Sequence, residues 1–122
     1  MSEKFKTMPH SIEAEQSVLG AMLIDNEAPL TIFSALTGDD FYSAVNKKIY
    51  ERMQELYRAN KPIDFVTLTD LLDKNGELEN VGGIEYVTTL TNAVPSAANF
   101  KYYVDIVKRD SLFRKLISSG QK

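Results

Sequence analysis

Residues 45–62 read VNKKIYERMQELYRANKP, and this stretch carries the longest clean apolar stripe in the chain. Its apolar side chains recur at steps of four and three residues, namely Val45, Ile49, Met53 and Leu56. That spacing places them on one face of an α-helix. Proline has no backbone N–H to donate and restricts the residue before it, so Asn60-Lys61-Pro62 predicts the end of this helix.

Helical spacing extends to the rest of the chain, and no segment shows the sustained alternation of a half-buried strand. Further helices are predicted over residues 11–26, 28–36, 64–75, 84–92 and from 100 onward, with a turn at 39–42. Ser11 and Asp64 are expected N-caps, and Gly76 suits a left-handed helix end. The expected inward-facing side chains include Ile12, Leu19 and Leu23 in the first helix and Ile84, Val87 and Leu90 in the fifth.

These segments predict an all-α fold, a compact bundle of five to six short helices followed by a long C-terminal helix. With 122 residues, 43% of them hydrophobic and 25% charged, the chain fits one soluble globular domain with a single core. No apolar run approaches the roughly 18 residues of a membrane span, and the N-terminus lacks the apolar core of a secretory signal. We therefore expect a cytoplasmic protein with no membrane partner.

The chain has no cysteine and a single histidine, His10. Disulfides, zinc ribbons and thiol nucleophiles are therefore excluded. A metal site or a Ser-His-Asp triad would depend on this one side chain near the N-terminus, so the ordinary interpretation is a solvated histidine. We predict no catalytic, cofactor-binding or metal-binding residue.

Charge is distributed unevenly along the chain. Residues 1–99 carry 8 basic and 15 acidic side chains, a formal charge of −7, whereas residues 100–122 carry 6 basic and 2 acidic, a charge of +4. The acidic part would repel a phosphate backbone, while the basic tail is suited either to nucleic acid or to an acidic protein surface. Charge alone does not decide between these two partners.

The last predicted helix has two apolar clusters separated by a polar segment. The first cluster is Phe100, Tyr103, Val104 and Val107, and the second is Leu112, Phe113, Leu116 and Ile117. Between them lies Lys108-Arg109-Asp110-Ser111, where we expect the helix to leave its own core. The second cluster then predicts a surface for another molecule or domain. The alternative is that the helix folds back and buries this cluster against the head.

Several blocks of the sequence resemble the N-terminal region of DnaB-type replicative helicases. They are Pro9 with residues 11–21, Asp40-Phe41-Tyr42, residues 62–67, Val81-Gly82-Gly83 with Tyr86, and residues 94–99 with Tyr103, Ile106 and Val107. The resemblance covers roughly residues 8–117. It departs from the family at Ser43-Ala44, where a proline is common, and this change implies a slightly longer following helix.

The resemblance implies a flexible N-terminus (1–10), a helical head (11–99) and the truncated first arm of a helical hairpin (100–122). The family's RecA-like motor domain, which uses ATP and Mg²⁺, is absent from this sequence. In the family, hairpins pair between subunits, six N-terminal regions form a collar, primase docks on it, and a loader protein places the helicase at the origin. The implied role is non-catalytic assembly and primase docking in the bacterial replisome.

The expected interface residues follow from this resemblance. Leu112, Phe113, Leu116 and Ile117 match the hairpin arm and are expected to pack against another subunit or primase. Tyr86 is expected either to reach primase or to be a half-buried core tyrosine. A further basic set, Arg109, Arg114 and Lys115, is expected to pair with acidic residues of a partner.

The sequence leaves two other function classes to consider, and both are disfavoured. A stand-alone nucleic-acid binding module is the main alternative, but the acidic head and the lack of a basic recognition helix oppose it, so this fragment is expected to bind little or no DNA directly. A small hydrolase is weaker, because the close carboxylate pairs Asp39-Asp40 and Glu13-Glu15 do not face one another on a helix. Gly82-Gly83 lacks the Gly-Lys-Ser/Thr and the strand of a phosphate loop.

Overall fold

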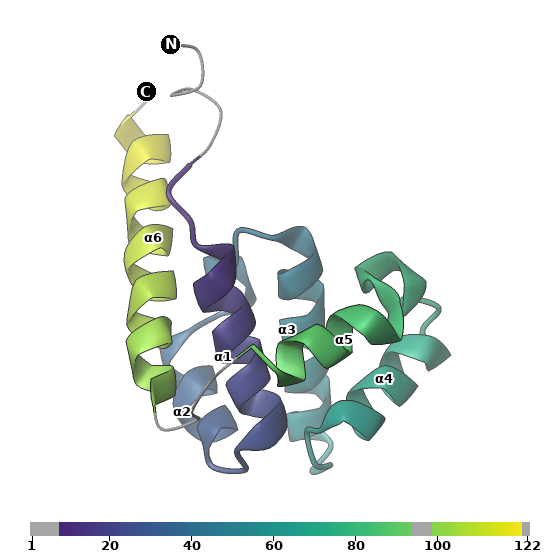
Figure 1. Ribbon diagram of the computed structural model, residues 1–122. Helices are drawn as coiled ribbons and strands as arrows, with labels where there is room; N and C mark the ends of the chain where they lie inside the picture. Colours follow the sequence, from purple (N-terminus) through teal and green to yellow (C-terminus); the bar gives the residue numbers. More distant parts are fainter. Residues whose placement is uncertain (1–7, 94–98, 121–122) are drawn as a thin grey trace.

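The computed structural model describes residues 8–93 and 99–120, and this part of the chain is entirely helical (Figure 1). In order, its elements are α1 (Ile12–Ile24), α2 (Ala28–Ala35), the 3₁₀ turn η2 (Gly38–Asp40), α3 (Ala44–Arg58), α4 (Phe65–Lys74), the 3₁₀ turn η3 (Glu79–Val81), α5 (Gly83–Thr91) and α6 (Phe100–Gly120). The all-α prediction is confirmed, and each predicted helix exists within a few residues of its expected bounds. η3 was not predicted as a separate element.

α1 forms the centre of the head, with α5 and α6 on opposite sides of it (Figure 1). It is buried on nearly every side from Ala14 to Leu23, and not only at the predicted Leu19 and Leu23. Ile12, expected inside, is exposed. Small residues allow the close packing: a Cβ added at Gly20 would lie 2.2 Å from the carbonyl oxygen of Leu90 in α5.

Local side-chain hydrogen bonds begin the helices where the sequence predicted. The Ala14 amide donates to Ser11 Oγ at 3.1 Å, and Asp64 accepts from the Thr67 amide at 2.9 Å. α3 ends just before Asn60-Lys61-Pro62 as predicted, but through a different residue of that segment than Pro62. Asn60 has a left-handed φ of 63°, and the Lys61 amide donates to the Leu56 carbonyl at 2.9 Å, so Asn60 ends the helix before Pro62 is reached.

The core contains buried apolar side chains from all six described α-helices, packed around α1. Within the stripe that predicted α3, Ile49, Met53 and Leu56 are buried and Val45 is partly buried. Ile84 was wrongly predicted to face inward and is more than half exposed, because the short α5 has only one buried face. Within the described ranges, no helix combines the length and apolar character needed to cross a lipid bilayer.

The predicted flexible segment and the predicted connector lie largely outside the described residues, which exclude 1–7 and 94–98. The remaining part of the first segment contacts the fold. His10 stacks on Tyr42 with ring centroids 4.0 Å apart, and its Nδ1 lies 2.7 Å from the Met8 carbonyl oxygen. The expectation of a solvated histidine is therefore corrected, because an aromatic ring covers one face of the imidazole.

Candidate partner-binding surface on the last helix

The N-terminal half of α6 is attached to the head by apolar packing. α6 lies against α1, α2 and η2. Phe100, Val104 and Val107 are buried, and their spacing of four and three residues places them on one side of the helix. The predicted apolar face of this half is thus observed, although Tyr103 is only partly buried.

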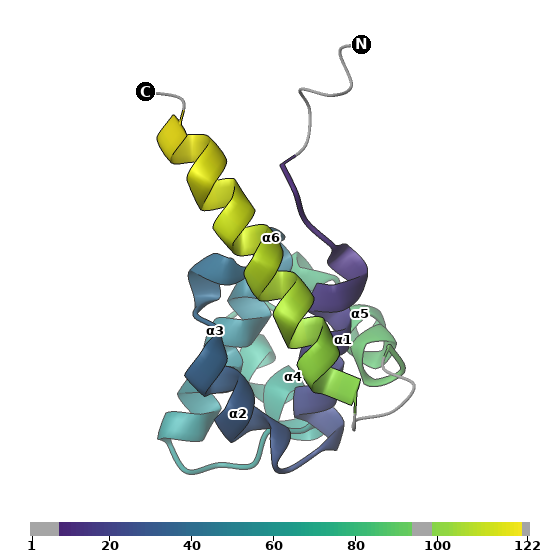
Figure 2. The ribbon, with the colours of Figure 1, turned by 90° about the vertical axis from the view of Figure 1, so that its left-hand side faces the viewer.

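The distal half of α6, residues 112–120, extends beyond the head (Figure 2). Four large apolar side chains are exposed there: Leu112 (49%), Phe113 (47%), Leu116 (66%) and Ile117 (40%). We call these four residues the apolar patch. Their spacing keeps them on neighbouring turns, and the described part of the chain leaves all four of them exposed. The alternative in which this half folds back onto the head is therefore wrong.

The polar segment before the apolar patch does not mark the point where α6 leaves the head. Asp110 and Ser111 are buried. Ser111 Oγ donates a 2.6 Å hydrogen bond to Asp40 Oδ1, and the Asp40 side chain is 1% exposed. The prediction failed because a buried polar pair replaces apolar contact at this turn of the helix.

Asp40 is a buried carboxylate that is held ionised. Burial alone would raise its pKa, but the hydrogen bonds from Ser111 and the Thr37 amide, together with the charges of Lys108 and Lys115, leave the pKa of Asp40 below its ordinary value. The Thr37 amide donates to Oδ2 at 2.7 Å. The lysine nitrogens lie farther away, at 3.7 Å for Lys108 and 3.5 Å for Lys115. The short hydrogen bonds fix the position of the carboxylate.

The guanidinium group of Arg114 forms hydrogen bonds within the chain. Its Nη1 donates to the Pro9 carbonyl and its Nη2 to the Asp40 carbonyl, each at 2.8 Å. The guanidinium carbon also lies 5.5 Å from the centre of the Tyr42 ring, whose plane His10 stacks on. The expectation that Arg114 is available to an acidic partner is therefore corrected, because its hydrogen bonds tie α6 to two parts of the head.

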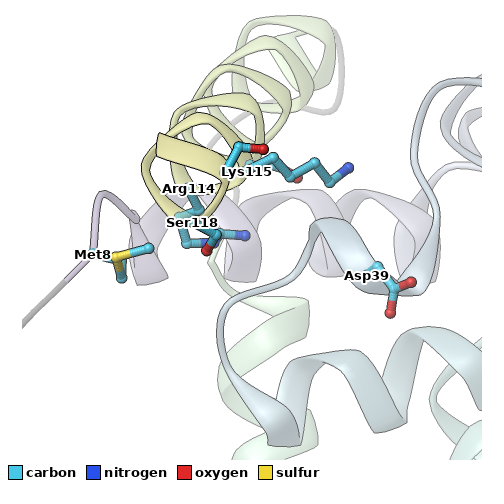
Figure 3. Close-up of a pocket in the computed structure, with 7 residues that line it drawn as sticks. Met8, Asp39, Arg114, Lys115 and Ser118 are labelled. Carbon is cyan, nitrogen blue, oxygen red and sulfur yellow. The ribbon is translucent and has the colours of Figure 1, made fainter. Parts of the chain in front are cut away.

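The other two predicted basic residues are more accessible. Arg109 is 58% exposed and contacts the adjacent Asp110 at 3.2 Å. Lys115 is 57% exposed and borders an open hollow of about 540 Å³ that Asp39 also lines. Figure 3 shows Met8, Asp39 and Ser118 around the same hollow. Arg109 and Lys115 therefore remain candidates for steering a charged partner.

Tyr86 is not brought together with the apolar patch. It lies on α5, which packs on the other side of α1 from α6 (Figure 1). Its hydroxyl donates to Asn46 Oδ1 at 2.6 Å and accepts from Gln16 Nε2 at 3.2 Å. Burial raises the pKa of this half-buried phenol. Tyr86 thus contacts the head through its hydroxyl, and its side chain is only partly buried.

Glu15 is a buried charged residue whose role was not predicted from the sequence. It is 2% exposed and lies on the central helix α1. Its carboxylate accepts from the Tyr42 amide at 2.7 Å, the Ser43 amide at 3.3 Å and Asn46 Nδ2 at 3.0 Å, at the start of α3. Glu15 follows the same helical stripe as Val18, Leu19 and Met22, and an acidic residue on an apolar stripe was the available signal.

The buried carboxylates of Glu15 and Asp40 hold elements of the head together through hydrogen bonds. Glu15 and Asp40, which belong to the two carboxylate pairs weighed for a hydrolase, are both buried and hydrogen-bonded. Within residues 8–93 and 99–120, no group of three or more His, Cys, Asp or Glu side chains is arranged to hold a metal ion.

The sequence model of the "DnaB-like helicase N terminal domain" family matches residues 7–109. The chain belongs to this family. It is 42% identical to the replicative DNA helicase DnaB of Leifsonia xyli subsp. xyli over 96% of its length, and 43% identical to DnaB of Geobacillus stearothermophilus over 98%. The chain spans 26% and 27% of the length of these two curated relatives.

Solved structures agree with this assignment. The N-terminal domain of DnaB helicase from Mycobacterium tuberculosis is similar with a TM-score of 0.90 and 38% identity, covering 94% of this chain and 82% of that one. A second structure, described as a DnaB-like replicative helicase and its interactions with primase, matches with a TM-score of 0.79 and 32% identity. It covers 91% of this chain and 26% of that one. The resemblance found in the sequence is confirmed.

Proposed function

We propose that this chain is the non-catalytic assembly and docking domain of a hexameric replicative DNA helicase. The observation that carries the proposal is the apolar patch, which projects beyond the head on the distal half of α6. Membership of the DnaB-like N-terminal domain family supports the same role. ATP and Mg²⁺ would act in the motor domain of the whole helicase, and we assign no cofactor to this domain.

The proposed first partner is another copy of the domain. Fully covering a large apolar side chain contributes about 1.5 to 3 kcal/mol, and the four residues of the patch are only partly covered in this chain. A second helix laid along the patch would bury them together. The whole helicase would repeat this contact to build a dimer and then a hexamer.

The proposed second partner is primase, with the helicase loader as a further one. One similar structure is that of a helicase described with its interactions with primase. The patch and the partly buried side chain of Tyr86 are the surfaces we propose for such docking. The place of action would be the replisome in the bacterial cytoplasm. The alternative of a stand-alone nucleic-acid module is not favoured, because Arg114 is bound to the head and Lys108 and Lys115 lie near Asp40.

The test compares two double variants of the chain. Leu116→Asp with Ile117→Asp places two charges in the apolar patch. Val66→Asp with Leu30→Asp is the matched control, because these residues are 70% and 62% exposed on α4 and α2, which carry neither the patch nor Tyr86. Sedimentation over a range of concentrations should show self-association of the wild type and the control, and a monomer for the patch variant.

Primase binding is measured on the same three proteins by calorimetry, with the helicase-binding domain of primase as the ligand. The patch variant should lose heat of binding that the control retains. If the patch variant behaves like the wild type in both sedimentation and calorimetry, the proposed role of the patch is wrong.

A further inference from the structure

α6 remains attached to the head beyond the point where its apolar packing ends. Val107 is its last buried apolar side chain, and Ser111 is its last buried residue among those described. The side chains that face the head recur at steps of four, three, four and three: Phe100, Val104, Val107, Ser111 and Arg114. One stripe along the helix thus changes from apolar to polar after Val107.

The polar part of this stripe binds two segments that are distant in sequence. Ser111 contacts the Asp40 carboxylate, and Arg114 divides its hydrogen bonds between the Pro9 and Asp40 carbonyls. We call Asp40, Ser111 and Arg114 the polar anchor. Because its contacts come from η2 and from the segment before α1, they restrain both the tilt and the rotation of α6.

The apolar patch lies on the side of α6 away from the anchor. At about 100° per residue, Leu112, Phe113, Leu116 and Ile117 are centred roughly opposite the stripe that contains Ser111 and Arg114. Whatever fixes the rotation of the stripe therefore also fixes the direction in which the patch faces.

The anchor also bears on whether the distal half stays helical. The 13 residues 108–120 follow Val107, the last buried apolar side chain of α6, and isolated helices shorter than about 12 to 15 residues are marginal in water. We propose that the polar anchor is a positioning device that keeps this segment helical and aims the apolar patch. The inference rests on the proposed function, in which the patch is the interface; an ordered patch binds without first losing conformational freedom.

Arg114→Gln is the variant that tests the anchor, and Arg109→Gln is its matched control. Both remove one positive charge from the same helix, but within the described ranges the polar contact of Arg109 is with the adjacent Asp110 and not with a distant part of the head. Hydrogen exchange is measured on dilute, monomeric protein. Amides of residues 112–118 should exchange roughly tenfold faster in Arg114→Gln and at the wild-type rate in the control, because two charge-assisted hydrogen bonds are lost only in the former. Ser111→Ala should also accelerate this exchange.

Self-association is then measured by sedimentation. Arg114→Gln should weaken it roughly tenfold while the head core keeps its wild-type exchange rates. Unchanged exchange in Arg114→Gln and Ser111→Ala, or equal acceleration in Arg109→Gln, would overturn the inference. Faster exchange with unchanged association would overturn the positioning role. If the wild type itself does not associate, the proposed function fails, while the exchange data still decide whether the anchor orders the helix.

Discussion

Replacing Gly20 by alanine should destabilise the head, although alanine is the better helix former. The added Cβ would lie 2.2 Å from the Leu90 carbonyl oxygen and 3.3 Å from its carbon. A relaxed carbon–oxygen contact is longer by roughly 1 Å, so α1 and α5 must separate. That carbonyl is backbone and cannot rotate aside.

The expected size follows from two opposing effects. Overpacking a core costs about 1 to 3 kcal/mol, and removing a glycine from a helix interior recovers about 1 kcal/mol. Because a backbone atom must move, we expect the upper part of the first range and a net loss of about 2 kcal/mol. Urea unfolding followed by circular dichroism measures it. Gly120→Ala is the control, since nothing lies within 4 Å of the Cβ that it adds. If Gly20→Ala is as stable as the wild type, the close packing of α1 on α5 is refuted.

Three further perturbations have defined outcomes. Glu15→Gln should lower the unfolding free energy by about 2 to 4 kcal/mol in urea titrations, because an amide nitrogen would face backbone donors that now meet a carboxylate. Tyr50→Phe should cost about 1 to 2 kcal/mol in the same assay, since the buried Leu36 carbonyl loses a 2.8 Å hydrogen bond. The Arg52 hydrogen bonds lower the pKa of Glu77 to about 2, so the stability they give is present above its unfolded pKa of about 4.3 and is lost as pH falls toward 2. Arg52→Gln should make this loss of stability at low pH smaller, which thermal unfolding curves recorded at several pH values would measure.

The helices and their first residues were predictable because their signals are local. Ser11, Ser43 and Asp64 each accept from an amide three residues ahead, within reach of a sequence window. The apolar patch was also predictable, because four large apolar side chains on an otherwise basic helix are an unusual pattern for a solvated face.

Burial on all sides of α1 and the attachment of α6 were not predictable. The burial of α1 depends on how many other helices surround it, and the periodicity of its own sequence carries no information about that number. The second depends on partners far away in sequence: Ser111 lies 71 residues from Asp40, and Arg114 lies 105 residues from Pro9. A single sequence gives no measure of such pairings, so a buried polar turn was mistaken for an exposed one.

The polar character of the stripe after Val107 resolves an ambiguity in the docking of α6. Had Ser111 and Arg114 been apolar, this part of the helix would present apolar side chains on two opposite sides. Either side could then pack against the head. A polar pair satisfies only a site with matching donors and acceptors, which Asp40 and Pro9 supply. Polar contacts are weak sources of net stability but discriminate strongly between arrangements, because a wrong arrangement leaves them unpaired. The anchor therefore leaves the apolar patch as the side of the helix that a partner can cover.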